Sequence, residues 1–152
     1  MEIIFSDYEF RTRMVEEKQE IFDIVRKKFV ALTPEEWVRQ HFLHFLTADL
    51  NYPKSLISVE KQLKYNNLPR RTDVVLYNRE GAPKLIIECK APNLEVNQST
   101  FEQIARYNLK LKAEYLVVSN GTTTYGCQVD IKKQSYQFID SFPKAEEVIG
   151  LI

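Results

Sequence analysis

The residues best suited to chemistry in this chain are two carboxylates and a lysine on neighbouring predicted strands. Stretches rich in Val, Leu and Ile at Thr72–Tyr77 and Lys84–Lys90 flank a segment with glycine and proline, which predicts a β-hairpin. In a symmetric hairpin Asp73 lies directly across from Glu88, with Cβ atoms roughly 5 Å apart, and Lys90 shares that face. Because like charges repel there, the patch favours a divalent cation, with Lys90 as a partial counter-charge.

The alternative interpretation of these residues is structural. Asp73 and Glu88 would then be charges at strand ends that form salt bridges with Arg70, Arg71 or Lys90, as most charged pairs in proteins do. Both strands are rich in branched aliphatic residues, which is typical of central strands rather than edge strands. A central strand that ends in alternating Glu and Lys favours the chemical interpretation.

A helix is predicted to begin at Thr33 and to run to about Leu50. Thr33 is a favourable N-cap, Pro34 suits the first helical position, and Glu36 completes a Thr-x-x-Glu capping box. The capping box assigns the side chain of Glu36 to the backbone of Thr33.

Glu35 begins the apolar stripe of this helix. It shares the i, i+3, i+7 spacing with Val38 and Phe42, so its side chain is expected to face the sheet. An acidic group in that position is costly unless it meets a cation or a hydrogen-bond donor. The plain alternative is a surface ion pair with Arg39, four residues further along.

Composition and charge narrow the class of protein. The chain has 152 residues with 21 basic and 21 acidic side chains, which is ordinary for one globular domain and argues mildly against tight autonomous DNA binding. No apolar run approaches the ~20 residues of a membrane span and no signal-peptide pattern is present, so we expect a cytoplasmic protein without membrane association. Cys89 and Cys127 offer neither a disulfide framework nor a paired zinc spacing.

The order of the predicted elements indicates a single α/β domain over residues 1–152. Residues 1–32 form an extension with strands near 8–15 and 20–30, residues 33–121 form the core, and residues 122–152 add strands and a short helix. The core is predicted to contain a helix at 33–50, strands at 55–65, 72–77 and 84–90, a helix at 99–112 and a strand at 115–119. Antiparallel hairpins followed by a helical crossover imply a mixed sheet with helices on its faces.

Five blocks of sequence resemble a known family. Between Pro34 and Gly121 they are, in order, PEEWVRQ, RRTDVVLY, IIECKAP, FEQIARYN and YLVVSNG. An aspartate at the start of one strand and Glu-x-Lys on the next resemble the PD-(D/E)XK nuclease signature. Together the blocks resemble the N-terminal nuclease domain of type I restriction enzyme R subunits, especially small stand-alone proteins of that domain. The resemblance implies the αβββαβ core of the restriction-endonuclease-like fold.

The resemblance also implies a metal site. The ion would be magnesium or manganese, which prefer oxygen ligands. Its ligands would be Asp73, Glu88, the backbone carbonyl of Cys89 and, directly or through water, Glu35. Lys90 would orient the attacking water or stabilise the transition state.

Two further residues come from the second long helix. Gln103 and Tyr107 are four residues apart, so they project one above the other. They match the Gln-x-x-x-Tyr element that accompanies the signature in several branches of the superfamily, where the pair is thought to position the substrate or the catalytic lysine.

The function that these resemblances imply is divalent-metal-dependent hydrolysis of phosphodiester bonds in DNA by an endonuclease. The chain has no G-x-x-x-x-G-K-[ST] loop, so no nucleotide-driven motor is expected. The alternative is a catalytically inactive nucleic-acid-binding or protein-interaction module on the same fold. The expected partner is DNA, with a homodimer or a partner protein that supplies DNA binding as further possibilities.

Overall fold

The computed structural model describes residues 1–60, 62–65 and 68–150, with the backbone alone for residues 62–65, 68–71, 107 and 110. Six strands form the main sheet: β4 (Ile57–Val59), β7 (Val74–Tyr77), β8 (Pro83–Cys89), β9 (Tyr115–Ser119), β10 (Thr124–Asp130) and β11 (Ser135–Phe138). Their order across the sheet is β11-β10-β9-β8-β7-β4. The α-helices are α1 (Pro34–His44), α2 (Gln98–Asn108) and α3 (Ala145–Ile149).

The main sheet is mixed, as predicted. Strands β8 and β9 are parallel, and the other neighbouring pairs are antiparallel. A parallel neighbour cannot be reached through a tight turn, and α2 supplies the crossover between β8 and β9. The carboxyl ends of β8 and β9 therefore lie side by side, with Cys89 paired with Ser119.

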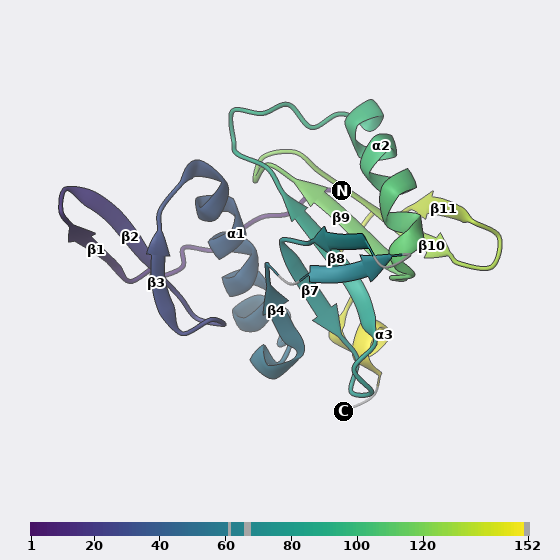
Figure 1. Ribbon diagram of the computed structural model, residues 1–152, viewed down its shortest axis with the longest axis horizontal. Helices are drawn as coiled ribbons and strands as arrows, with labels where there is room; N and C mark the ends of the chain where they lie inside the picture. The colour runs from purple at the N-terminus through teal and green to yellow at the C-terminus, as the bar shows by residue number, and fades with distance from the viewer. Residues whose placement is uncertain (61, 66–67, 151–152) are drawn as a thin grey trace.

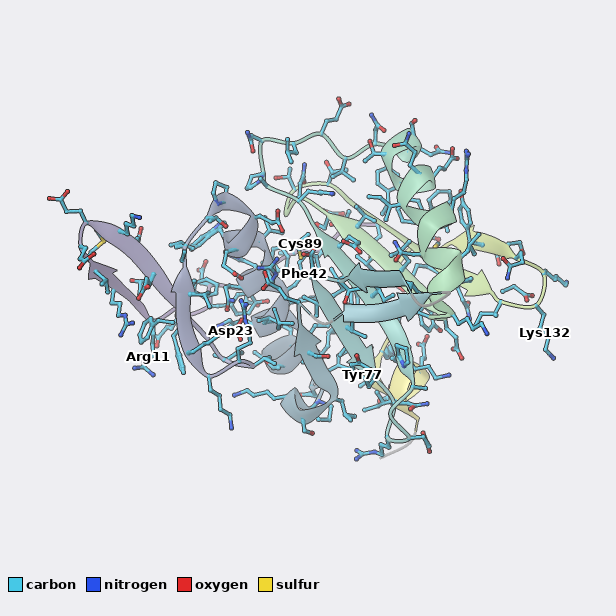
Figure 2. The ribbon with its side chains drawn as sticks, in the orientation of Figure 1. Arg11, Asp23, Phe42, Tyr77, Cys89 and Lys132 are labelled. Atoms are coloured by element: carbon cyan, nitrogen blue, oxygen red, sulfur yellow. The ribbon has the colours of Figure 1, made fainter. Side chains whose placement is uncertain are left out.

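Two hydrophobic clusters cover the two faces of this sheet. The first joins α1 and α3 to one set of alternating strand residues, among them Val74, Ile87 and Cys89. The second joins α2 to the intervening residues, such as Val75 and Ile86. Cys89 and Phe42 both belong to the first cluster and lie between α1 and the sheet (Figure 2). The predicted alternation along β8, with the Cys89 side chain in the core, is confirmed.

Helix α1 lies between the main sheet and a second, three-stranded antiparallel sheet (Figure 1). The smaller sheet consists of β1 (Thr12–Val15), β2 (Lys18–Asp23) and β3 (Lys28–Ala31). The side chains that α1 buries include polar ones, namely Glu36, Arg39 and Gln40. A helix covered on two sides buries more of its circumference than a single apolar stripe allows.

The predicted strand at 20–30 is wrong, because the chain turns within it. The Asp23 carboxylate accepts hydrogen bonds from the backbone N–H groups of Val25 (2.8 Å) and Arg26 (2.6 Å). Aspartate often stabilises such a turn with its own side chain. Lys27 then takes a left-handed backbone conformation with φ of 55°. The extension is therefore a sheet of three short strands.

The single strand predicted at 55–65 is also wrong. Residues Lys54–Leu56 form a 3₁₀ turn before β4, and Glu60 has a φ of 55°. This conformation is unusual for a residue with a side chain and ends β4. The following β5 (Gln62–Tyr65) pairs with β6 (Leu68–Arg71) in a separate two-stranded sheet. The first predicted helix does continue to Asp49, but at Phe45 it changes from α-helical to π-helical geometry.

Candidate functional site

The hairpin of β7 and β8 has the predicted register. Val74 pairs with Ile87 and Val75 with Ile86, and the paired residues end there, one position before Asp73 and Glu88. The register shifts only near the turn, at Leu76/Tyr77. Asp73 precedes β7, and its Oδ2 accepts a hydrogen bond of 2.7 Å from the backbone N–H of Cys89. Asp73 and the Glu-x-Lys segment therefore meet at one end of the central strands.

Asp73 is also held by a cation from α1. The Nη2 atom of Arg39 donates to Oδ1 of Asp73 over 3.0 Å. The Arg39 side chain is 5% exposed and lies within 4 Å of three further carboxylates, those of Glu35, Glu36 and Glu60. Burial alone would lower the pKa of Arg39, but Glu36 and Asp73 outweigh it and raise the pKa above its ordinary value. Arg39 is thus a permanent positive charge at the centre of an acidic cluster.

The two glutamates of α1 differ from the prediction in their burial and in the bonds of Glu36. Glu36 is buried, and its Oε1 accepts from Arg39 (2.7 Å) and from Arg26 (3.0 Å). Thr33 does cap the helix by accepting from the Glu36 N–H, but the Glu36 side chain bonds these arginines instead of the Thr33 backbone. Glu35 is 47% exposed and pairs with Arg39 over 3.2 Å. The smaller sheet buries Glu36, which local spacing could not indicate.

Glu35 nevertheless lies close to the end of the hairpin. Burial and then the Asp73 charge raise the pKa of Glu35, against the opposing effects of Arg39 and Lys90. The predicted surface ion pair with Arg39 and the predicted proximity to Asp73 therefore both occur, through the same guanidinium. The charge of Lys90 acts on Glu35 as well. The Lys90 backbone N–H donates to the Ser119 carbonyl oxygen over 2.8 Å.

A second layer of charges links the cluster to the smaller sheet. Asp23, at the end of β2, is buried and accepts from Arg26 (2.8 Å) and from Gln40 (2.9 Å). Gln40 also donates to Glu36. Burial would raise the pKa of Asp23, but the Arg26 N–H, Gln40 and the Arg26 guanidinium together lower it. Figure 2 shows Asp23 beside α1. Asp23 and Gln40 are 17 residues apart and carry no motif, so sequence reasoning missed their contact.

The predicted pair on α2 is not brought to the site by any described contact. Phe101 and Ala105 face the sheet, as predicted, whereas Gln103 is exposed. The side chain of Tyr107 lies outside the described residues, as do those of Arg70 and Arg71 in the structural alternative for Asp73 and Glu88.

The site fits a divalent cation in residue type but only partly in arrangement. Carboxylates of Asp73, Glu88 and Glu35 are the ligands that Mg²⁺ and Mn²⁺ prefer. In the described part of the chain, however, no three His, Cys, Asp or Glu side chains are arranged to hold a metal ion. In addition, both oxygens of Asp73 already accept hydrogen bonds, from Arg39 and from the Cys89 N–H. A metal at Asp73 must share it with Arg39 or displace Arg39.

The thiol of Cys89 is unsuited to ligation. It is buried, and this burial, followed by the charge of Asp73, raises its pKa well above the ordinary value. A protonated thiol is neither a nucleophile nor a metal ligand. Any contribution of Cys89 to the site must come from its backbone.

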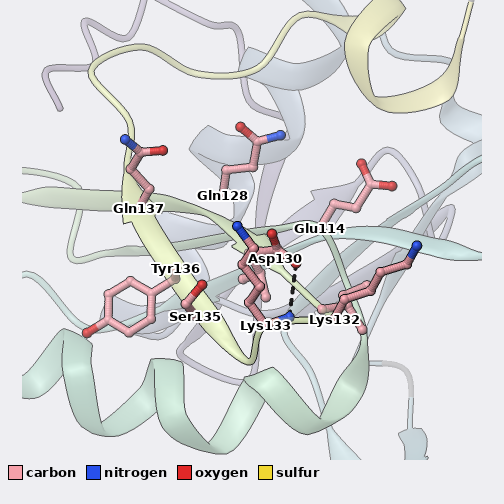
Figure 3. Close-up of a pocket in the computed structure, with 10 residues that line it drawn as sticks. Glu114, Gln128, Asp130, Lys132, Lys133, Ser135, Tyr136 and Gln137 are labelled. Atoms are coloured by element: carbon pink, nitrogen blue, oxygen red, sulfur yellow. Dashed lines mark hydrogen bonds between the residues drawn. The ribbon is translucent and has the colours of Figure 1, made fainter.

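A large open pocket of about 720 Å³ lies elsewhere, between β10 and β11 (Figure 3). Glu114 lines it and precedes β9, so the pocket is at the opposite end of that strand from Ser119. Both of its carboxylates are paired locally: Glu114 with Lys84 over 2.7 Å, and Asp130 with the Lys133 N–H. This pocket contains none of the predicted site residues.

The fold and the site define a mixed α/β domain in which an aspartate and a Glu-x-Lys segment meet at one end of the central strands. Apart from the inserted β5–β6 pair, the order α1, β4, β7, β8, α2, β9 is the predicted αβββαβ sequence of elements. The chain belongs to the family of type I restriction enzyme R protein N-terminal domains, whose profile matches residues 34–143.

A solved structure resembles the chain more distantly. It is a fragment from Vibrio vulnificus YJ016 assigned as an HsdR subunit of a type I restriction enzyme. The match has 20% identity and a TM-score of 0.40, and it covers 60% of this chain but 19% of that one. No curated protein matches the chain significantly. Among the described residues, no helix has the length and apolar character needed to cross a membrane.

Proposed function

We propose that this domain is a magnesium- or manganese-dependent DNA endonuclease that resembles the nuclease domain of type I restriction R subunits. The observation that carries the proposal is the hydrogen bond from the Cys89 N–H to Oδ2 of Asp73, which holds this aspartate against the Glu-x-Lys segment. Family membership over residues 34–143 supports it. The chain spans a small part of its structural relative, and the proposal extends neither to DNA translocation nor to the whole enzyme.

The proposed roles follow from the chemistry of each group. Asp73 and Glu88 would hold the ion, with the Cys89 carbonyl and Glu35 as further or water-mediated ligands. When bound, the ion would supply a Lewis acid for the phosphate and a site that activates water. The Lys90 ammonium would orient that water and stabilise charge that develops on the phosphate, where a fixed cation is effective. Gln103 and Tyr107 are proposed to position the substrate or Lys90.

Three variants test these roles. We expect Asp73→Asn, Glu88→Gln and Lys90→Ala each to reduce cleavage of labelled DNA by at least ~100-fold, as is usual for loss of a charge-stabilising group. Glu80→Gln, in the exposed turn of the same hairpin, is the matched control and should cleave like the wild type. Circular dichroism and melting temperature establish that each variant is folded. Full activity in a folded Lys90→Ala variant would contradict the assigned role of the lysine.

A second candidate function is an inactive DNA-binding or protein-interaction module. The zero net charge and the guanidinium of Arg39 beside Asp73 favour it. Such a module would need a partner protein or a second copy of the chain to contact DNA strongly. Binding of a labelled duplex at several salt concentrations addresses this point, since each neutralised phosphate steepens the salt dependence. Salt-dependent binding without cleavage in either metal would favour the module over the enzyme.

A further inference from the structure

A second, smaller pocket lies beside the candidate catalytic site. It has a volume of about 210 Å³. Its walls are the aromatic side chains of Phe5, Trp37 and His41 on one side, with Pro92 and the turn Asn120–Thr122 on the other. The pocket is therefore lined by flat rings on one side and by a polar turn on the other.

Chain connectivity joins this pocket to the candidate site. Trp37 follows Glu35 and Glu36 in the first turn of α1, and Pro92 is two residues beyond Lys90. The turn follows β9, whose carboxyl end is next to that of β8. In sheets with parallel strands, ligands commonly bind just outside these carboxyl ends. A strand of substrate bound at Lys90 would thus lie near the pocket.

The turn that forms one wall is held by several hydrogen bonds. The Ser119 hydroxyl accepts from the Gly121 N–H (3.0 Å), and the Asn120 side-chain oxygen accepts from the N–H groups of Thr122 and Thr123. Gly121 has a φ of +90°, and a Cβ there would lie 3.4 Å from a methyl carbon of Val38. Glycine is the natural residue for this conformation. The wall is therefore preorganised and packs directly on α1.

The aromatic wall presents an accessible ring. Trp37 is 41% exposed although it is large and apolar. Its ring packs edge-on against His41, with centroids 4.4 Å apart, and near Phe10 at 5.2 Å. His41 Nδ1 donates to the Trp37 carbonyl oxygen over 2.8 Å, which fixes the imidazole and leaves Nε2 as an acceptor in the neutral ring. Part of the Trp37 surface is thus open, while its edge is supported.

We propose that this pocket receives one unstacked nucleobase of a DNA strand whose backbone lies at the candidate catalytic site. Aromatic rings that stack on bases are a sequence-tolerant way to bind single strands, and each contributes roughly 1–3 kcal/mol. The inference rests on the proposed function and names its substrate class: single-stranded DNA, or duplex DNA in which one base is unpaired. A base in an intact duplex cannot enter without the cost of unpairing.

The chain's single tryptophan makes the test direct. Trp37 fluorescence is followed in chelator, so that no cleavage occurs, while a twelve-nucleotide oligothymidine is added at low salt. The same titration uses a strand of equal length with abasic sites in place of bases, and a duplex without mismatches. We expect saturable quenching by the oligothymidine and little by the abasic strand or the duplex. Equal quenching by the abasic strand would overturn the inference.

Variants then separate stacking from general attraction to DNA. By anisotropy of a labelled oligothymidine, Trp37→Ala should weaken binding about 5- to 150-fold, the equivalent of ~1–3 kcal/mol, while Trp37→Phe retains most of the affinity. The slope of affinity against salt concentration should stay unchanged, because no phosphate contact is lost. Phe138→Ala, which removes a comparably exposed aromatic ring on β11, is the matched control and should bind normally. An unchanged affinity of Trp37→Ala would refute the pocket.

The outcomes distinguish this inference from the proposed function. Suppose that a Trp37→Ala variant still cleaves DNA in metal, with unaltered affinity and unaltered preference for single strands. That result would refute the base-binding pocket and leave the proposed nuclease function standing. Base-dependent quenching of Trp37 fluorescence in a protein that cleaves no DNA in either metal would refute the nuclease function and support the pocket as a binding site. No binding of any DNA at low salt would overturn both.

Discussion

Replacing Arg39 with glutamine is the perturbation whose consequences the structure determines most fully. The guanidinium pairs with Asp73 at 3.0 Å and Glu36 at 2.7 Å, and it also lies beside Glu35 and Glu60. Glutamine keeps hydrogen-bonding capacity but removes the positive charge of the guanidinium. The carboxylates around it would then repel one another in a partly buried site, with Arg26 as the remaining guanidinium bonded to Glu36.

The size of the effect follows from the burial of the pair. Arg39 and Glu36 are 5% and 7% exposed, and removing one partner of a buried ion pair typically costs about 3–5 kcal/mol. In a domain of this size each kcal/mol shifts the melting temperature by roughly 2–4 °C, so Arg39→Gln should melt roughly 6–20 °C lower in chelator. Arg79→Gln, in the exposed β7–β8 turn, is the matched control and should shift the melting temperature by no more than about 2 °C.

A divalent cation should partly reverse this loss. If the ion and Arg39 compete for Asp73, removal of the guanidinium frees the Asp73 carboxylate for the ion. It also removes a positive charge that repels the ion. Millimolar Mg²⁺ or Mn²⁺ should therefore raise the melting temperature of Arg39→Gln more than that of the wild type, by linkage of binding to folding. Differential scanning fluorimetry with and without metal measures both values. Equal metal-induced shifts in the two proteins, or a loss no greater than that of Arg79→Gln, would refute the reasoning.

Three further predictions concern neighbouring residues. Glu36→Gln should lower the free energy of unfolding by about 1–3 kcal/mol, because it weakens buried bonds to charged partners. Glu35→Gln, at a half-exposed side chain, should change that free energy by less than ~1 kcal/mol. Urea denaturation measures both values, and a larger loss for Glu35→Gln would contradict the assignment of Glu36 as the buried glutamate. Burial, then the charges of His41 and Lys54, lower the pKa of His44 below its ordinary value of 6.5. The unfolded chain therefore binds this proton more readily than the folded protein, and the protein loses stability as the pH falls below 6.5. His44→Gln should flatten the melting temperature between pH 7 and pH 5, and an unchanged slope would count against this account. Gly121→Ala should cost more than about 1 kcal/mol, because its φ of +90° disfavours a side chain, and a neutral result in the same denaturation assay would contradict this strain.

Local patterns predicted much of the fold and the centre of the site. The alternation of aliphatic residues and the turn near Gly81 were enough to give the register in which Val74 pairs with Ile87 and Val75 with Ile86. The N-cap at Thr33 was equally local and is confirmed by its hydrogen bond from the Glu36 N–H. These features depend on residues close in sequence or on a single hairpin, for which spacing rules are reliable.

The environment of Asp73 could not be predicted, since it depends on contacts across the fold. Arg39 is 34 residues away from Asp73 in sequence, and packing of the smaller sheet beside α1 brings Arg26 to Glu36. The same packing turns Glu36 inward and brings Asp23 to Gln40. The left-handed conformation of Glu60, which ends β4, is another consequence of tertiary structure that propensities do not indicate. The capping role predicted for the Glu36 side chain is therefore wrong, whereas the predicted proximity of Glu35 to Asp73 does occur.

The most direct test of the proposed nuclease is a cleavage assay of the wild-type domain beside Asp73→Asn. Labelled single-stranded, duplex and branched DNA are incubated with Mg²⁺, with Mn²⁺ and with chelator, and calorimetry follows metal binding in the same samples. The account predicts cleavage of at least one substrate by the wild type in metal alone, with loss of both cleavage and metal binding in Asp73→Asn. No cleavage of any substrate and no metal binding by the folded wild-type protein would contradict it.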